Sequence, residues 1–262
     1  MIRKHSGHRL LIFALALSFA GCAGSSSNAK DPLNYTENAK HSYENALRAF
    51  LEQDHELSNQ LMEEVKRNYG YSRYARLAEL RLADTAYSQQ KYAEAITMYK
   101  SFVHDYPNDA EVPYARYRVA RSQFSQASPS VLMAPLEERD LAAVQDSYRS
   151  IRAFLADFPN YKRSEDLKYM RAETVGLLAR HELYVARFYL RRDNFDAAVA
   201  RIKFALNRYA KSGLDPEAIV LLGETYLKMK KRDDARKAFE QVLSEHSSSP
   251  FSVPARRFLA TM

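Results

Sequence analysis

The stretch KYAEAITMYKSFVHDYP, residues 91–107, carries the pattern from which the architecture of this chain follows. In it an aromatic residue precedes the small residue Ala95 by three positions, and Tyr99 and Phe102 follow Ala95 at four and seven positions. Side chains with this spacing share one face of an α-helix. Pro107 then ends the helix, because proline has no backbone N–H with which to continue the hydrogen-bond ladder. The stretch therefore predicts one helix with a single buried face.

The same pattern recurs around other small residues, which indicates a repeat protein. Residues 194–209 repeat it around Ala198, and residues 232–242 repeat it around Ala235. A second helical pattern precedes each of these helices. The pair resembles the tetratricopeptide repeat, whose unit of about 34 residues is a helix–turn–helix. One small residue marks each of five units: Ser58, Ala95, Ser147, Ala198 and Ala235.

We therefore expect an all-α fold, a tetratricopeptide-repeat solenoid of about five helix–turn–helix units with a C-terminal capping helix. No stretch alternates apolar and polar residues for long enough to predict a strand. Residues 125–138 break the helical periodicity with two prolines and are expected to form a surface loop. A long helix is predicted from about Ser164 to Arg192, and a short capping helix over residues 255–260.

The start of the chain has the layout of a secretory signal. Three cations come first, residues 10–19 form an apolar run too short to span a bilayer, and Ala20-Gly21 offer a small-residue cleavage site. A cysteine directly after the cut distinguishes a bacterial lipoprotein signal from an ordinary one, so Cys22 is predicted to carry a lipid anchor in the outer membrane. The alternative is an ordinary signal peptide followed by an incidental cysteine.

These patterns divide the chain into four predicted parts. Residues 1–21 are the lipoprotein signal peptide, and residues 22–34 are a lipidated, flexible Gly/Ser-rich tether. Residues 35–126 hold repeats 1 and 2 and the first helix of repeat 3. Residues 127–262 hold the inserted loop, the remainder of repeat 3, repeats 4 and 5 and the capping helix.

Composition and charge exclude several classes of function. The chain is 46% hydrophobic and 27% charged, as globular proteins are, and its single cysteine allows no disulfide within the chain. The net charge of +7 falls to +4 when the three cations of the leader leave, which argues against nucleic acid as a partner. His181-Glu182 would need a second histidine at Val185 to form a metalloprotease motif. We expect no catalytic residue, no metal and no cofactor.

Basic charge is concentrated in the predicted fourth repeat. Residues 162–211 hold twelve Lys or Arg and six Asp or Glu. Arg180, Arg187 and Arg191 form one stripe on the long helix, with Tyr184 between them. Because protein interfaces favour arginine and tyrosine, this stripe is a candidate partner-binding surface, and a solvated stripe without a partner is the alternative. Neighbouring apolar residues of the same helix are predicted to face the core: Leu178, Val185 and Phe188.

The N-terminal repeats suggest a second surface. A stack of such units forms a concave groove lined by the first helix of each unit. Apolar and aromatic grooves accept extended peptides or helices. Each candidate is predicted either to line this groove or to pack beneath it as core: Tyr43, Leu47, Tyr87, Tyr117 and Phe124.

Three segments resemble the BamD family of outer-membrane lipoproteins. Residues 68–74 resemble the family's R-Y-P-x-x-x-Y segment, with Gly70 in place of the proline. Residues 138–140, Glu-Arg-Asp, look like the acidic-Arg-Asp turn of the family. Residues 178–189 are similar to its L-A-x-x-E-x-x-V-A-x-(F/Y)-Y helix. With the leader and the five repeats, the resemblance covers essentially the whole chain.

The resemblance implies a lipid-anchored, non-enzymatic protein on the periplasmic face of the outer membrane that takes part in the assembly and insertion of β-barrel proteins. It implies that the C-terminal repeats dock an acidic surface of a BamA-type barrel protein, with Arg201 as a further contact. It also implies that the N-terminal repeats recognise unfolded outer-membrane proteins. Other assembly lipoproteins are further candidate partners.

A second reading of the same features stays open. A different tetratricopeptide lipoprotein, an adaptor of pilus biogenesis or envelope division, would share the lipid anchor on Cys22 and the repeats. The two readings differ in the proteins that should co-purify from membranes.

Overall fold

The computed structural model describes residues 32–127 and 141–262, and within these residues it contains eleven α-helices and no strand. This confirms the predicted all-α fold for the described part of the chain. The helices in chain order are α1 (Pro32–Leu51), α2 (His55–Asn68), α3 (Arg73–Ser88), α4 (Tyr92–Asp105), α5 (Val112–Ala127), α6 (Ala142–Asp157), α7 (Ser164–Leu190), α8 (Phe195–Arg208), α9 (Asp215–Lys228), α10 (Arg232–Glu245) and α11 (Ser252–Thr261).

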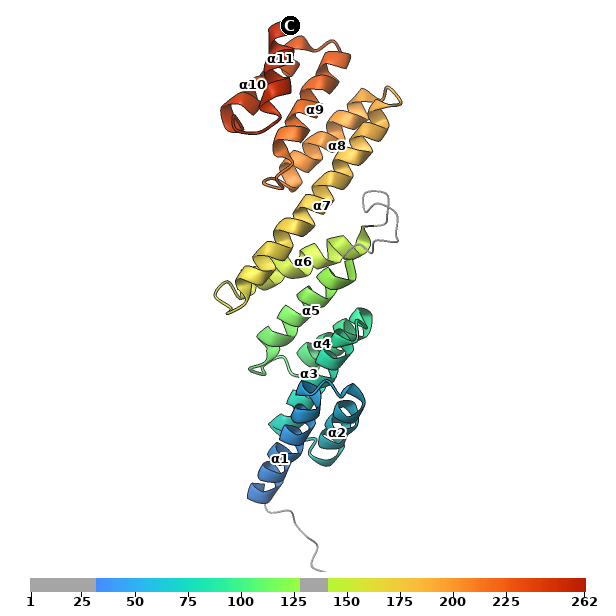
Figure 1. Ribbon diagram of the computed structural model, residues 1–262, viewed down its shortest axis with the longest axis vertical. Helices are drawn as coiled ribbons and strands as arrows, with labels where there is room; N and C mark the ends of the chain where they lie inside the picture. Colours follow the sequence, from blue (N-terminus) through green and yellow to red (C-terminus); the bar gives the residue numbers. More distant parts are fainter. Residues whose placement is uncertain (1–31, 128–140) are drawn as a thin grey trace, which may run out of the picture.

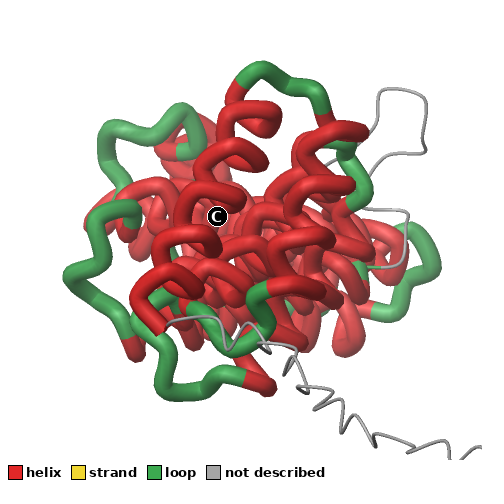
Figure 2. Tube along the Cα trace, turned by 90° about the horizontal axis from the view of Figure 1, so that it is seen from below, coloured by secondary structure: helices red, strands yellow, loops and turns green. Residues whose placement is uncertain are grey.

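The helices pack in sequential pairs that stack along one long axis. The pairs are α1 with α2, α3 with α4, α5 with α6, α7 with α8 and α9 with α10, and α11 packs against the last pair. Figure 1 shows the stack from its N-terminal to its C-terminal end, and Figure 2 shows it from below. The expected five units with a C-terminal capping helix are confirmed.

Close approach of the two helices of a unit depends on small side chains. Each residue that marks a repeat is completely buried: Ser58, Ala95, Ser147, Ala198 and Ala235. A larger side chain at these positions would push the paired helices apart, because protein interiors are close-packed. In the last unit the close approach requires a glycine, since a Cβ on Gly223 of α9 would lie 2.5 Å from the ring of Phe239 on α10.

Tight turns reverse the chain between the two helices of repeats 1, 2, 4 and 5. Each of these four turns contains a residue in the left-handed region, with φ between 55° and 63°. Side chains cap two of the helices that follow: Asp54 accepts a hydrogen bond from the N–H of Leu57, and Asn194 accepts one from the N–H of Ala197. The left-handed residues are Gln53, Gln90, Asp193 and Lys230.

The 27-residue helix α7 joins the two halves of the stack. Leu167 near its start packs with buried residues of α5 and α6, whereas Leu183 and Ala186 near its end pack with α8 and α9. The rings of Tyr148 on α6 and Tyr209 after α8 also meet, with centroids 6.3 Å apart. One continuous helix therefore belongs to the core of both halves.

Some boundaries differ from the sequence prediction. Helix α1 begins at Pro32, so residues 32–34 of the predicted tether are helical, and proline suits the first turn of a helix. Helix α7 ends at Leu190, two residues earlier than predicted, and α11 is longer than predicted. Of the predicted loop, residues 125–127 belong to α5, and residues 128–138 lie outside the described residues.

The predicted lipid anchor, Cys22, also lies outside the described residues. Across residues 32–127 and 141–262, no helix combines the length and the apolarity that crossing a membrane requires.

Candidate partner-docking surfaces

The basic stripe predicted on the long helix lies on α7. Arg180 and Arg191 are exposed, and Tyr184 and Arg187 are half-buried. Arg191 caps the C-terminal end of α7, where the helix dipole favours a cation. The guanidinium of Arg187 forms an ion pair with Glu217 near the start of α9. This member of the stripe therefore also connects the first helices of repeats 4 and 5.

Arg201, the candidate on α8, makes a different ion pair. Its Nη1 lies 3.1 Å from Oε2 of Glu182 on α7. Glu182 and Arg187 are five residues apart, which is about 140° around a helix of 3.6 residues per turn. Arg201 therefore approaches α7 from another side than the one from which Glu217 meets Arg187. The five candidates divide into a stripe on α7 and a separate arginine on α8.

The prediction that Phe188 faces the core is wrong, because its side chain is 36% exposed. It lies two positions after the buried Ala186, which is about 200° around the helix and so faces away from α8. The guanidinium carbon of Arg192 lies 3.6 Å from the centroid of the Phe188 ring. A cation over the ring face stabilises an aromatic at the surface. Leu178 is buried as predicted, and Val185 is half-buried.

The five groove candidates all lie on the first helices of repeats 1 to 3. Leu47, Tyr87 and Phe124 are half-buried and pack against buried clusters. Tyr43 is buried, and burial raises the pKa of its hydroxyl. Tyr117 has no exposed surface, so it is a core residue and cannot line a surface groove.

Tyr87 connects α3 to α5 through polar contacts. Its hydroxyl lies 3.1 Å from Oγ of Ser125 and accepts a hydrogen bond from Nε of Arg121 at 3.3 Å. The guanidinium carbon of Arg118 lies 4.3 Å from its ring centroid. Burial by itself raises the pKa of Tyr87, but these hydrogen bonds and the two arginine charges outweigh it and lower the pKa.

A buried carboxylate, Asp84 on α3, lies beside this contact. It accepts a hydrogen bond from the hydroxyl of Tyr114 at 2.7 Å and another from the hydroxyl of Tyr99. Arg81 and Arg118 form ion pairs with Asp84 at 2.7 Å and 3.1 Å. Burial and the charge of Asp84 raise the pKa of both tyrosines. We call Arg81, Asp84, Tyr87, Tyr114, Arg118 and Arg121 the arginine–tyrosine cluster.

The arginine–tyrosine cluster continues to the start of α7. Nη1 of Arg121 donates a hydrogen bond to the hydroxyl of Tyr117 at 3.0 Å, and this hydroxyl donates to Oδ2 of Asp166 at 3.0 Å. Sequence reasoning missed the cluster. The available signal was Asp84 itself, an acid within an otherwise apolar helix face, where a buried charge needs cationic or hydrogen-bonding partners.

The described residues offer no recognisable metal site, since no group of three or more His, Cys, Asp or Glu side chains among them could hold an ion.

The structure presents two candidate surfaces: a half-exposed basic stripe on the C-terminal half and a partly buried arginine–tyrosine cluster on the N-terminal half. Both combine residue types that protein interfaces favour.

Several relatives match much of this chain at low identity. Proteins named outer membrane protein assembly factor BamD are 28% identical over 184 residues in Xylella fastidiosa (strain 9a5c), 27% over 239 in Caulobacter vibrioides and 23% over 246 in Neisseria gonorrhoeae. The matches cover 68%, 90% and 92% of this chain, respectively. The chain spans 63% of the Xylella relative, 76% of the Caulobacter relative and 92% of the Neisseria relative.

Two solved structures are similar over most of the chain. TTC0263, a thermophilic tetratricopeptide-repeat protein of Thermus thermophilus, is 16% identical with a TM-score of 0.38, and covers 85% of this chain and 99% of its own. MamA (41-end) of Desulfovibrio magneticus RS-1 is 13% identical with a TM-score of 0.37, and covers 82% of this chain and 98% of its own.

The comparison with family models gives a match over nearly all of the repeats. Residues 36–253 match the family YfiO, described as outer membrane lipoprotein. This range runs from the first turns of α1 into the start of α11 and so includes both candidate surfaces. The resemblance to the BamD family is confirmed by the named relatives, and the chain belongs to the YfiO family of outer membrane lipoproteins.

Proposed function

We propose that this protein is a non-enzymatic scaffold that takes part in the assembly of β-barrel proteins in the outer membrane. The observation that carries the proposal is the family match over residues 36–253, together with relatives named outer membrane protein assembly factor BamD. An elongated stack of helix pairs suits a scaffold, because it offers long surfaces to more than one partner.

The C-terminal half docks an acidic periplasmic surface of a BamA-type barrel protein. Residues 162–211 carry a net charge of +6, from twelve basic and six acidic residues. Arg180 and Arg191 are exposed, and Arg187 and Arg201 keep more than 40% of their side-chain surface exposed although each pairs with a glutamate. Such arginines can bind a partner's carboxylates without unfolding the repeat.

The N-terminal half recognises unfolded outer-membrane proteins. Leu47, Tyr87 and Phe124 offer partly exposed apolar surface on three successive first helices. The arginine–tyrosine cluster lies on two of the same helices and supplies hydrogen-bond donors. An extended chain would find apolar contacts and donors alternating along the stack.

A lipid on Cys22 holds the scaffold at the outer membrane, on its periplasmic face. Cys22 precedes the first residue of α1, Pro32, by ten positions, so a lipid on Cys22 would keep the first repeat near the membrane.

Purification of the tagged, full-length protein from membranes tests the proposed function. We expect a barrel protein with periplasmic modules to co-purify, and we expect Cys22→Ala to move the protein to the soluble fraction. A secretin or peptidoglycan enzymes in place of the barrel protein would reject the assembly role and favour an adaptor of pilus biogenesis or envelope division.

A further inference from the structure

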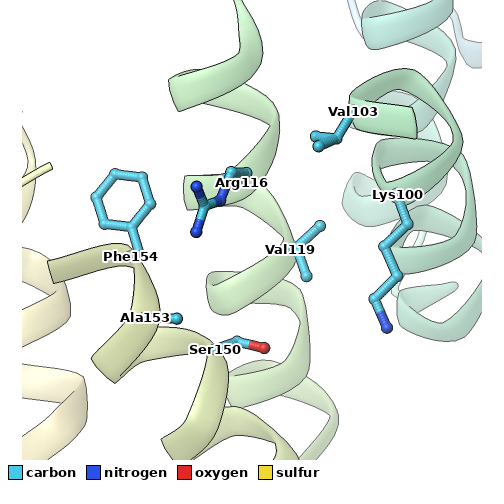
Figure 3. A pocket seen from close by; sticks show the side chains of 7 residues that line it. All are labelled: Lys100, Val103, Arg116, Val119, Ser150, Ala153 and Phe154. Atoms are coloured by element: carbon cyan, nitrogen blue, oxygen red, sulfur yellow. The ribbon is translucent and has the colours of Figure 1, made fainter. Parts of the chain in front are cut away.

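A half-open pocket of about 210 Å³ lies between repeats 2 and 3, outside both candidate surfaces. Figure 3 shows that its walls come from α4 and α6, the second helices of these repeats, and that α5 lies between them. Val103, Val119, Ala153 and the buried ring of Phe154 supply the apolar lining. Lys100, Arg116 and Ser150 supply the polar groups.

Two residues that line the pocket are smaller than their counterparts one repeat earlier. The buried positions of α3 and α5 match when the chain is shifted by 37 residues, so Val119 corresponds to Leu82. The repeat markers Ala95 and Ser147 make Ser150 the counterpart of Met98. Between repeats 1 and 2, the side chain of Met98 packs across the junction against the cluster that contains Leu82.

The charges at the pocket are of one sign. Its lining includes Lys100 and Arg116 and no carboxylate. Lys100 makes no ion pair with any of the described residues. Arg116 forms an ion pair at 2.5 Å with Asp157, which does not line the pocket. The entrance therefore favours an acidic group, and the floor favours an apolar one.

We propose that this pocket docks a segment of a partner protein that presents an aromatic side chain next to an acidic residue. The volume of the pocket is large enough for an aromatic side chain, because an apolar cavity of about 150 Å³ already holds a benzene ring. Aromatic side chains that fill pockets are common interface hot spots, and the rim around such a core is polar. This docking site is distinct from the two surfaces of the proposed function and can fail independently of them.

Methyl NMR on the full-length protein tests the proposal. The probe is the blocked peptide Gly-Asp-Glu-Phe-Asp-Glu-Gly, and the signals are the methyl groups of Val103 and Val119. We expect saturable shifts of these methyl groups with this peptide. The shifts should be lost when alanine replaces the phenylalanine, and weakened when Asn and Gln replace the acids.

Filling the pocket is the decisive variant. Ser150→Met restores the side chain of the preceding junction, and it should weaken binding of the peptide at least about tenfold, as loss of an interface anchor does. Ala156→Met adds the same side chain at an exposed position of α6 outside the pocket and should leave binding unchanged. If Ser150→Met impairs folding, Lys100→Glu on the exposed rim takes its place. This variant should weaken binding of the acidic peptide more than binding of the neutral peptide.

Several results would overturn the proposal. They are equal binding to Ser150→Met and the unsubstituted protein, equal binding of the alanine peptide, and the absence of shifts at both valines. Concentration-dependent shifts without any peptide would identify a second copy of the chain as the occupant. Binding to phosphatidylglycerol vesicles that Ser150→Met abolishes would identify a lipid instead.

Discussion

The guanidinium of Arg201 on α8 lies 3.1 Å from the carboxylate of Glu182 on α7, and the two side chains differ in exposure, 45% for Arg201 and 10% for Glu182. The nearly buried acid depends on the arginine, because a buried charge without a partner is unfavourable. The arginine depends less on the acid and keeps a face for solvent or a partner. One residue therefore stabilises repeat 4 and contributes to its basic surface.

Reversal of three arginines to glutamate, Arg187, Arg191 and Arg201, should abolish co-purification with the barrel protein at moderate salt. The reason is that three attractive charges become repulsive, and like charges across an interface are strongly unfavourable. Because two of these residues also make ion pairs within the fold, the melting temperature must be measured alongside.

Arg180→Glu alone separates docking from folding, since Arg180 is exposed in the middle of α7, away from the helix ends, and makes no ion pair with the described residues. It should weaken co-purification with little change in the melting temperature. Reversal of Lys40, Arg48 and Arg67, three exposed cations of the first repeat, is the control matched in charge. Unchanged co-purification of the triple variant would remove this docking assignment.

A photo-crosslinking side chain at Leu47 or Tyr87 should capture segments of unfolded outer-membrane proteins. Both positions are partly exposed on first helices of the N-terminal repeats, whereas the buried Tyr43 and Tyr117 are poor sites for such a probe. Tyr71, which is almost fully exposed in the turn between α2 and α3, is the control position. Capture at Tyr71 that equals capture at Tyr87 would count against a specific groove.

Gly223→Ala should destabilise the last repeat by about 1–3 kcal/mol, the cost of overpacking a well-filled core. The added Cβ would lie 2.5 Å from the ring of Phe239, which is completely buried and has little room to move. Gly176→Ala is the matched control, because its Cβ would meet the carbonyl oxygen of Ser212 at an ordinary 3.6 Å. Since alanine favours a helix interior, this variant should gain about 1 kcal/mol. Denaturant unfolding that ranks the two variants in the opposite order would contradict this packing.

Asp84→Ala should destabilise the N-terminal half by about 3–5 kcal/mol, the usual cost of removing one partner of a buried ion pair. Arg81 and Arg118 would lose their carboxylate, and Tyr114 would lose its acceptor. Asp84→Asn keeps an oxygen that accepts hydrogen bonds and should cost less. Chemical denaturation measures both variants, and a loss within about 0.5 kcal/mol for Asp84→Ala would show that the cluster adds no stability.

Lowering the pH should reduce the free energy of unfolding of the unsubstituted protein more than that of the Arg76→Leu variant. Burial by itself raises the pKa of Asp109, but hydrogen bonds from the backbone N–H of Glu111 and from Arg76, with the arginine charge, lower it overall. A carboxylate with a lowered pKa in the folded state contributes stability above its unfolded pKa of about 3.9, and this contribution is lost as pH falls through the folded pKa.

Unfolding free energies measured from about pH 6 down to about pH 3 check this prediction. The difference between the unsubstituted protein and Arg76→Leu should shrink as the pH falls. Burial chiefly raises the pKa of Glu79, so the contribution of this carboxyl to stability increases as the pH falls. Arg76 is not among the groups that shift the pKa of Glu79, so the Arg76→Leu comparison leaves this contribution unchanged. A difference that stays constant with pH would mean that Arg76 does not act through Asp109.

The periodic spacing of small and apolar residues was enough to predict the helices and their pairing, and the leader was enough to suggest a compartment. Ala95 with Tyr99 and Phe102 suffices for such an inference, because one helix face depends only on spacing along the chain. The same local rule failed at Phe188, since exposure depends on which side of α7 the next helix covers.

The packing of the helices determines which polar and charged side chains lie close enough to pair. Asp84 and Tyr114 are 30 residues apart, and Arg187 and Glu217 are also 30 apart, so no local pattern pairs them. The pocket between repeats 2 and 3 likewise depends on how Ser150 and Val119 fill a junction made by three helices. The repeat, the helix faces and the family resemblance could therefore be read from the chain alone. The ion pairs, the exposed surfaces and the space between units could not, because they depend on distances between residues that the fold brings together.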